Sequence, residues 1–332
     1  MLANASERLL QHYVDNFRRL PWRSPPGAAP PDPYRVWLSE VMLQQTTVAA
    51  VAGRFDRFVA RWSTVQALAA AADKDVLGEW AGLGYYARAR NLIACARQVA
   101  ASGGFPDTEE QLRKLPGIGD YTAAAIAAIA FGRHAAAVDA NVERVTARLH
   151  GLQSPSKAAV RSLVSAMLPE GRAGDFAQAM MDLGATICRP RQPRCGACPL
   201  SDSCAAFASG APERYPERAA RAAKPVRYGV AYWIEQRGSV WLVRRPANGL
   251  LGGMAALPGP DWTPELQPAP ALASLRHVFT HFELRLGIAA ASEPIGDGWW
   301  QPLDVLATAG LPTLYRRAAD AVVAARDQLA AA

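Results

Sequence analysis

Hydrophobic residues follow a helical period over about the first 186 residues of the chain. Apolar side chains recur at Leu38, Val41, Met42 and Val48, the spacing of a helix with one buried face. Further helices are predicted over residues 1–20, 55–72 and 141–149, and then onward to about residue 186. Residues 109–114 are good helix formers and 121–131 is an alanine-rich apolar run, so both are predicted to be helical as well. No run in the first 200 residues alternates with the period of two that marks a strand, so this part is predicted to be all-α.

Beyond about residue 225 the period of the apolar residues changes to two. The runs Arg227–Ile234 and Ser239–Arg244 flank a short turn at Arg237-Gly238 and predict a β-hairpin. Phe282–Ala290 predicts another strand, and Thr313–Leu329 predicts a helix. This second part of the chain is therefore predicted to be α+β.

The chain length of 332 residues suits two domains better than a single core. Residues 205–225 are rich in Ala, Pro, Glu and Arg and predict an exposed linker. The fold class is thus predicted to be multidomain, with an all-α region at 1–204 and an α+β domain at 226–332.

The charge and the hydropathy of the chain limit the classes of protein to which it can belong. Lys and Arg number 36 against 29 Asp and Glu, a net charge of +7 that is compatible with a polyanionic partner. The apolar run Ala123–Phe131 is too short to span a membrane. Residues 1–20 have the pattern of an amphipathic helix and not of a signal peptide. We therefore expect a cytosolic protein, with no membrane partner.

The motif Leu115–Gly119 (LPGIG) interrupts the helical pattern between two helix-forming runs. Pro116 cannot sit inside a helix, and Gly117 and Gly119 permit backbone angles that other residues resist. Helix, glycine hairpin and second helix together offer unpaired amides and a helix dipole to a phosphate. Asp120 follows directly, and a carboxylate there repels phosphate unless it points away or caps the helix.

The side chains of Asp139 and Glu40 can each be interpreted in two ways, one structural and one functional. Asp139, with Asn141 close behind, precedes a helical run and is either a helix N-cap or a functional residue. Glu40 is the one carboxylate on an apolar helix, either on a solvated face or buried as an acid.

Four of the five cysteines, Cys188, Cys195, Cys198 and Cys204, have the spacing C-x6-C-x2-C-x5-C. In a cytosolic protein such a group binds a metal and does not form disulfides. Tetrahedral zinc and a [4Fe–4S] cluster both accept four thiolates, so the residues alone leave both open. Cys95 lies apart and is expected to be a small buried apolar residue.

Further motifs occur at Leu20–Arg23 (LPWR), Trp37–Thr46 (WLSEVMLQQT) and Gly82–Leu92 (GLGYYARARNL). With the LPGIG hairpin, the VDANVERV segment and the cysteine loop, they resemble the MutY family of adenine DNA glycosylases, of the helix-hairpin-helix, endonuclease III-like superfamily. The resemblance implies a six-helix barrel, plus a cluster domain built from the N-terminal helix and residues from about 135 to 204. It also implies a [4Fe–4S] cofactor and the removal of adenine mispaired with 8-oxoguanine or guanine.

The resemblance assigns roles to matching residues. Glu40 corresponds to the catalytic acid and Asp139 to the superfamily's aspartate. Tyr121 stands where bifunctional relatives carry the lysine that forms a Schiff base, so β-lyase activity should be weak or absent. Matches to the adenine pocket or its surroundings are Leu20, Trp22, Arg23, Val48, Asn141 and Gln178. Matches to residues that probe or wedge the duplex around the oxidised guanine are Gln45, Leu83 and Tyr85, while Gly117 and Gly119 would face a phosphate.

The proposed chemistry also has a physical basis. Adenine is a poor leaving group as an anion, and a carboxylic acid whose pKa is raised by burial can protonate it. Loss of the base leaves positive charge on the sugar, which a nearby carboxylate stabilises. Glu40 and Asp139 suit these two duties. The base must also leave the stack to be reached.

In the C-terminal part, Arg244–Pro246, Gly249–Met254 and Leu257–Gly259 resemble the start of a Nudix-type domain. The acidic metal-binding helix of Nudix hydrolases does not follow in Pro260–Pro270, so no pyrophosphatase activity is expected. The resemblance implies instead a domain that reads 8-oxoguanine through a Phe-Ser-His loop. That loop reads Phe279, Thr280, His281 here, and threonine keeps the hydroxyl.

Three other functions compete with adenine excision. They are a bifunctional endonuclease III-like glycosylase for oxidised pyrimidines, a non-catalytic iron–sulfur DNA-binding protein, and a nucleotide hydrolase. Tyr121 opposes the first, the pair Glu40 and Asp139 opposes the second, and the missing acidic helix opposes the third. The expected partner is double-stranded DNA, with repair or replication proteins docking at the linker of a monomeric, nucleoid-associated, bacterial-type enzyme.

Overall fold

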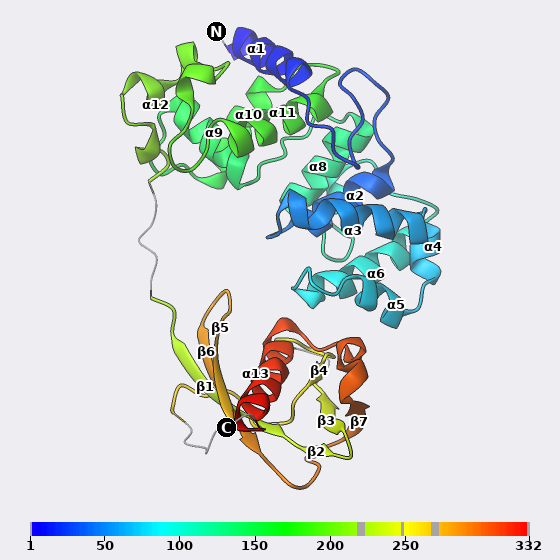
Figure 1. Ribbon diagram of the computed structural model, residues 1–332. Coiled ribbons are helices and arrows are strands. Elements are labelled where there is room, and N and C mark those ends of the chain that lie inside the picture. The colour runs from blue at the N-terminus through cyan, green and yellow to red at the C-terminus, as the bar shows by residue number, and fades with distance from the viewer. Residues whose placement is uncertain (1, 218–222, 247–248, 267–271, 331–332) are drawn as a thin grey trace. The chain divides into compact units, whose positions relative to one another are not determined.

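The computed structural model describes residues 2–217, 223–246, 249–266 and 272–330. The chain divides into two compact units (Figure 1). One comprises Met1–Asp73 and Arg90–Ala220, and the other comprises Lys74–Ala89 and Arg221–Ala332. No helix in the described ranges is both long enough and apolar enough to cross a lipid bilayer.

The first unit is helical, as predicted, and no strand occurs in the described range 2–217. Its α-helices are α1 (Leu2–Asp15), α2 (Pro33–Leu43), α3 (Val48–Arg61), α4 (Val65–Ala70), most of α6 (Tyr86–Ala101), α7 (Glu109–Leu112), α8 (Asp120–Phe131), α9 (Ala140–His150), α10 (Lys157–Met167), α11 (Ala173–Thr186) and α12 (Ala205–Ala208). Short 3₁₀ turns occupy Cys195–Ala197, Ser201–Ser203 and Pro212–Arg214.

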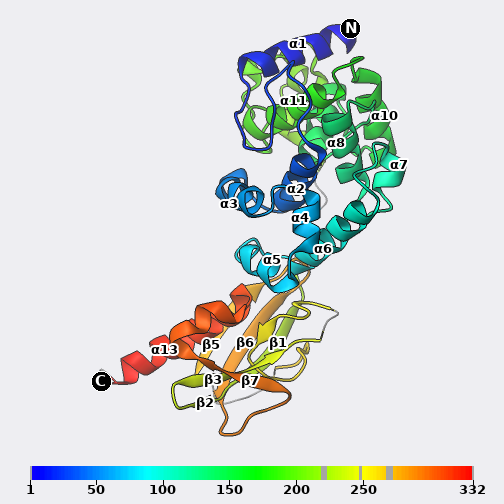
Figure 2. The same ribbon diagram turned by 90° about the vertical axis from the view of Figure 1, so that its right-hand side faces the viewer.

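Helix α8 forms the centre of this unit and packs against α2, α7 and α11 (Figure 2). Its residues from Thr122 to Ala130 are buried on every side, as a helix without a polar face requires. Small side chains let its neighbours approach closely: a Cβ at Gly174, in α11, would lie 2.9 Å from the carbonyl oxygen of Ala128. The helix ends at Gly132, which adopts the left-handed conformation (φ 63°).

Two helices differ from the prediction. The expected helix 1–20 ends at Asp15. There the backbone amide and the side chain of Asn16 both donate to the carbonyl oxygen of His12 (3.0 Å each), so the side chain helps to satisfy a carbonyl group at the helix end. The expected helix 55–72 is two helices, α3 and α4, separated at Trp62–Thr64. Thr64 caps α4 by accepting a hydrogen bond from the Ala67 amide, a local polar signal that apolar periodicity does not detect.

The exposed linker expected over 205–225 is not found in its first part. Helix α12 packs against α9, and Ala206 is fully buried. Further along, the Glu217 amide donates to the carbonyl oxygen of Gln153 (2.7 Å). Residues 205–217 therefore contact the helical unit through the buried Ala206 and the Glu217 amide, although most of their side chains are exposed or half-buried. Residues 218–222 lie outside the described residues.

The second unit contains two sheets. In the first, β1 (Val226–Trp233) pairs in parallel with β6 (Glu283–Ala290), which pairs antiparallel with β5 (Ala273–Val278). In the second, β3 (Ser239–Arg244) pairs antiparallel with β2 (Glu235–Gln236), β4 (Ala255–Ala256) and β7 (Gly298–Pro302). The unit also holds α5 (Asp73–Glu79), the 3₁₀ segment Leu303–Ala309 and α13 (Thr313–Ala330).

The core of the C-terminal part lies between the first sheet and α13. Leu284, Leu286 and Ile288 of β6 face Leu314 and Val322 of α13 in one buried cluster. This arrangement of a mixed sheet and a covering helix agrees with the α+β class expected from the sequence.

The predicted hairpin forms only in part. Arg237 and Gly238 have positive φ values of 49° and 71°, as a tight two-residue turn requires. However, β1 does not pair with β3; it pairs with β6 instead, and only β2 continues the hairpin. Strand β1 is covered closely on its other side, since a Cβ at Gly259 would lie 2.2 Å from the Val230 carbonyl oxygen.

Candidate active site

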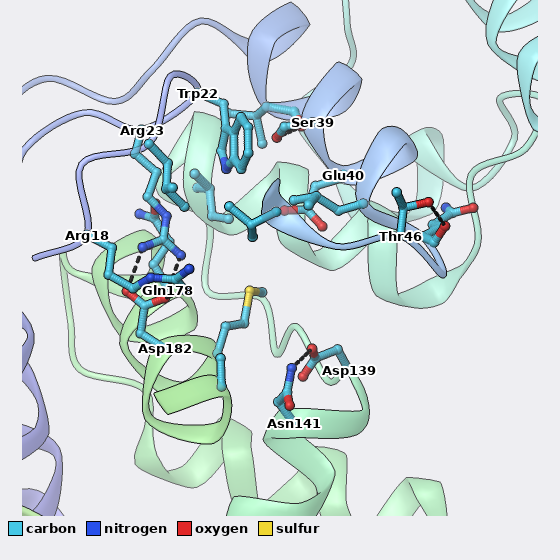
Figure 3. Close-up of a pocket in the computed structure, with 18 of the residues that line it drawn as sticks. Arg18, Trp22, Arg23, Ser39, Glu40, Thr46, Asp139, Asn141, Gln178 and Asp182 are labelled. Atoms are coloured by element: carbon cyan, nitrogen blue, oxygen red, sulfur yellow. Dashed lines mark hydrogen bonds and ion pairs between the residues drawn. The ribbon is translucent and has the colours of Figure 1, made fainter. Parts of the chain in front are cut away.

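A cavity of about 560 Å³ opens in the helical unit between α2, α8, α11, the start of α9 and the loop that follows α1 (Figure 3). Segments far apart in the sequence meet here. The predicted residues that line the cavity are Leu20, Trp22, Arg23, Glu40, Gln45, Val48, Tyr121, Asp139, Asn141 and Gln178. The sequence analysis missed Arg18, Ser39, Gln44, Thr46, Met181 and Asp182, which line it as well.

Glu40 is a buried acid on α2. The helix begins with Asp32 as N-cap and Pro33 at its first turn, and Glu40 lies on its inner face with 7% of its surface exposed. The Tyr121 hydroxyl donates to Glu40 Oε2 at 2.7 Å. Burial raises the pKa of Glu40 from 4.5 to about 7; nearby Asp139 adds to this rise, while Tyr121 and Arg23 oppose it. A solvated role for Glu40 is therefore excluded.

Asp139 has both of the roles that its sequence context left open. As the N-cap of α9 it accepts a hydrogen bond from the Val142 amide through Oδ1 (2.7 Å). Its Oδ2 accepts from Asn141 Nδ2 (2.9 Å), and both side chains line the cavity (Figure 3). Gly184 of α11 fixes the position of Asn141, because a Cβ at Gly184 would lie 2.6 Å from the Asn141 Cβ.

Arg144 connects the Asp139 side of the cavity to the cysteine loop. It donates to Asn141 Oδ1 and to the carbonyl oxygens of Gly184 and Cys188, each at 2.8 Å. The sequence analysis did not single it out, although its spacing of three residues from Asn141 places both on one face of α9.

Asp182 clamps the loop between α1 and α2. It accepts from Arg18 (2.9 Å) and from both terminal nitrogens of Arg23 (2.6 and 3.1 Å). The Asp182 side chain is 12% exposed and that of Arg23 is 8% exposed. The clamp holds Leu20 and Trp22 against the cavity. Its one sequence signal is the four-residue spacing from Gln178, which puts both side chains on the same face of α11.

Replacing Asp182 with Asn should destabilise the fold by roughly 2–4 kcal/mol, because two guanidinium groups would lose their shared anion in a largely buried place. Urea unfolding of wild type and variant measures this. Asp175→Asn is the matched control on the same helix, since Asp175 pairs only with the more exposed Arg172, and should cost less than about 1 kcal/mol. Equal stability of the two variants would contradict the clamp.

The candidate duplex-probing residues occupy turns. Gln45 follows α2 with a positive φ of 56° and lines the cavity. In the second unit, Leu83 is buried, whereas Tyr85 is half exposed with a φ of 49°. The Tyr85 hydroxyl lies 3.3 Å from the hydroxyl of Thr280, so two residues predicted to read the same nucleotide are neighbours within that unit. Positive φ is uncommon for non-glycine residues and often marks functional turns.

The LPGIG hairpin needs only one of its glycines for conformation. Gly117 has a φ of 75° and packs so closely that a Cβ would lie 2.8 Å from the Asn91 Cβ. Gly119 has a φ of −93°, and a Cβ there would meet nothing within 4 Å, so the expected conformational need is wrong for Gly119. Asp120 pairs with Arg113 at 3.2 Å, which satisfies the carboxylate that would otherwise oppose a phosphate.

The four clustered cysteines line one small pocket with Arg148, and none of them forms a disulfide bond. Burial, with a smaller contribution from the other cysteines, raises the pKa of Cys198 to about 11. Cys195 and Cys204 have raised pKa values for the same main reason. Such thiols become thiolate ligands when a metal supplies positive charge, so the donor set fits a Cys₄ metal group. Cys95 is buried, as expected.

The Phe279–His281 segment forms the turn between β5 and β6. Phe279 is anchored: its ring stacks on Trp262 (5.6 Å between centroids) and contacts Phe282 (4.8 Å). Thr280 and His281 are exposed at the turn. The structure therefore separates a packing residue from two residues that are accessible to a ligand.

Comparison with known families agrees with this geometry. Residues 38–170 match the HhH-GPD superfamily of base excision DNA repair proteins, residues 188–204 the iron–sulfur binding domain of endonuclease III, and residues 229–321 the NUDIX domain. The four cysteines thus hold a [4Fe–4S] cluster.

A solved thermostable thymine-DNA glycosylase matches with a TM-score of 0.56 and 30% identity, over 61% of this chain and 95% of that one. A trapped endonuclease III–DNA covalent intermediate matches with a TM-score of 0.53 and 25% identity, over 62% and 95%. The fold class is that of the helix-hairpin-helix DNA glycosylases, with a Nudix-like domain added.

Sequence comparison with individual relatives shows which kind of DNA glycosylase the chain resembles. Adenine DNA glycosylases match from Homo sapiens (35% identity over 83% of this chain and 64% of the relative), Mycobacterium tuberculosis (44% over 61% and 68%) and Buchnera aphidicola (30% over 85% and 84%). The chain spans 64% of the length of the human relative. The chain belongs to the adenine DNA glycosylase family of base excision repair enzymes.

Proposed function

We propose that this enzyme hydrolyses the N-glycosidic bond of adenine mispaired with 8-oxoguanine or guanine in double-stranded DNA. The observation that carries the proposal is Glu40, a buried carboxyl with a pKa of about 7 that faces Asp139 across one cavity. Two carboxyl groups in different environments divide acid and anionic duties, as sugar hydrolysis generally requires.

In the proposed reaction the flipped adenine enters the cavity and Glu40 donates its proton to a ring nitrogen of the base. The bond between the sugar C1′ and the base breaks, and its electron pair leaves with the base as neutral adenine. Asp139 stabilises the positive charge that develops on the sugar. Water then adds to C1′, and its surplus proton returns to Glu40.

Tyr121 supports monofunctional chemistry. Its hydroxyl is occupied by the hydrogen bond to Glu40, and it has no amine that could form a Schiff base with the opened sugar. The enzyme is therefore proposed to release the base without cutting the strand, in contrast to a bifunctional glycosylase.

Recognition of the mispair is proposed to involve both ends of the chain. Gln45, Leu83 and Tyr85 would wedge the duplex and hold the base opposite adenine, together with the exposed Thr280 and His281. Gly117 and Gly119 would place backbone amides against a phosphate. We also propose that the enzyme is a monomer, that it associates with the nucleoid, and that repair proteins dock near residues 205–225.

The rate of excision should fall as pH rises above about 7. Glu40 must be protonated to act, and its raised pKa of about 7 means that the protonated fraction is high below that pH and falls about tenfold per unit well above it. Single-turnover rates between about pH 6 and pH 9 measure this dependence. A rate that rises with pH over this interval would show that Glu40 acts as a base and not as an acid.

The proposal is tested by single-turnover cleavage of three duplexes, with adenine opposite 8-oxoguanine, adenine opposite guanine, and thymine glycol. Each product is read with and without alkali. Adenine release with strand breaks only after alkali supports the proposal. Cleavage of thymine glycol without alkali would establish the bifunctional pyrimidine alternative, and tight binding without excision would establish a non-catalytic binding protein.

A further inference from the structure

Arg148 lies on the inner side of α9 beside the cysteine pocket. It is only 2% exposed and lines the same pocket as the four cysteines. The guanidinium donates to three backbone carbonyl oxygens, of Arg189 (2.7 Å), Tyr215 (3.0 Å) and Pro190 (3.3 Å). One of its terminal nitrogens also lies 3.4 Å from Cys188 Sγ.

This buried cation has no carboxylate partner among the residues that the structure describes. Carbonyl dipoles satisfy its hydrogen-bonding groups but do not neutralise its charge. A buried unpaired charge costs several kcal/mol, roughly, unless an opposite charge compensates it. The remaining neighbours are cysteine side chains, which bind a metal as anionic thiolates. A [4Fe–4S]²⁺ core with four thiolates carries a net charge of about −2, so it supplies the missing anion.

We propose that Arg148 is the internal counter-charge of the iron–sulfur cluster and protects it from oxidative loss. A positive charge beside the cluster favours its more negative states and opposes removal of an electron. The contact at Cys188 Sγ places that charge against a ligand atom. Arg148 is therefore a cluster-stabilising residue, separate from the adenine cavity.

Arg148 also ties both ends of the cluster loop together. It holds the carbonyl groups just after the first cysteine ligand and that of Tyr215, beyond the last one. Its own carbonyl oxygen lies 3.4 Å from Cys204 Sγ. Two roles, charge and tether, are thus combined in one side chain, and the test must separate them.

Three variants of the holoenzyme separate these roles. Arg148→Met removes the charge and the tethers with little change of length, while Arg148→Lys keeps the charge and loses most of the tethers. Arg144→Met is the matched control on the same helix, because Arg144 also tethers the cluster loop through the Cys188 carbonyl oxygen (2.8 Å) and is not among the described residues that line the cysteine pocket. Iron content and circular dichroism confirm that each variant is folded and loaded.

The probe is ferricyanide, which takes one electron from the [4Fe–4S]²⁺ core and is itself reduced to ferrocyanide. The readout is the rate at which the visible absorbance of the cluster bleaches. Arg148→Met should bleach about tenfold faster than wild type, the usual size of a loss in a metal's outer shell. Arg148→Lys and Arg144→Met should bleach at rates close to that of wild type.

Wild-type bleaching in Arg148→Met would overturn the proposal. Equal acceleration in Arg148→Met and Arg148→Lys would overturn it as well, because the tethers and not the charge would then protect the cluster. If Arg148→Met does not fold, Arg148→Lys still decides: the proposal requires a folded lysine variant with a protected cluster. Neither the bleaching rate nor the check of folding and iron content depends on adenine excision, so the outcome is independent of the proposed function.

Discussion

The Glu40→Gln variant is expected to bind duplex DNA as wild type does and to lose adenine excision by about 10³-fold, within the range for removal of a general acid. Glutamine has the same shape but no proton of suitable acidity. Its amide oxygen can still accept the Tyr121 hydrogen bond that Glu40 receives at 2.7 Å. The cavity should therefore keep its form while the chemistry stops. Single-turnover excision and fluorescence anisotropy on the same duplex measure the two properties.

The same variant has a second expected result, a gain in stability at high pH. Since the folded state raises the pKa of Glu40 from 4.5 to about 7, the folded protein holds this proton more tightly than the unfolded chain. Wild type therefore loses stability as pH rises from about 4.5 to 7, by up to about 3 kcal/mol. Glutamine does not ionise, so the variant should be more stable than wild type near pH 8 and similar to it near pH 4.

The exposed Glu7 on α1 supplies the control. Glu7→Gln also removes one carboxyl group, but from an exposed position, and should excise at the wild-type rate. Near-normal excision by Glu40→Gln would remove Glu40 as the acid, whereas loss of DNA binding would mean that the substitution damages the site more broadly.

The helical part of the fold could be predicted from the sequence because signals within each short segment determine its helices. An alanine-rich apolar run predicted the central helix, and in the structure that helix ends at Gly132. One error occurs where a polar side chain begins a new helix, as Thr64 does when it caps α4. In the sheets, pairing is not local: a turn at Arg237 suggested that β1 would join β3, whereas its partner β6 lies about 50 residues away in the sequence.

The active site was predicted through motifs and not through periodicity. Glu40, Tyr121 and Asp139 matched a family pattern, and the structure brings them to one cavity. Asp182 was missed because its partners, Arg18 and Arg23, are 164 and 159 residues away along the chain. No local pattern connects residues so distant. Arg144 was missed for a related reason, since two of its contacts are backbone carbonyls that carry no side-chain signal.

The Asp139→Asn variant is expected to reduce excision by about 10²–10³-fold, the usual cost of one electrostatic group that stabilises a transition state. The substitution removes the negative charge that faces the developing sugar cation. Its effect on folding should be small, because Asn is as good an N-cap as Asp. The amide oxygen can still accept the hydrogen bond that Asp139 receives from the Val142 amide. Single-turnover excision and thermal unfolding, measured together, test this separation.

A capping control distinguishes lost charge from a frayed helix. Ser156 caps α10 by accepting from the Ala159 amide (3.2 Å) and does not line the cavity. Ser156→Ala should lose about 1 kcal/mol of stability and keep normal excision, the opposite of Asp139→Asn. If Asp139→Asn instead loses stability and keeps its rate, Asp139 is a structural cap only. The sugar cation must then be stabilised by another group. Among the described residues that line the cavity, the one carboxylate besides Glu40 and Asp139 is Asp182, which Arg18 and Arg23 hold.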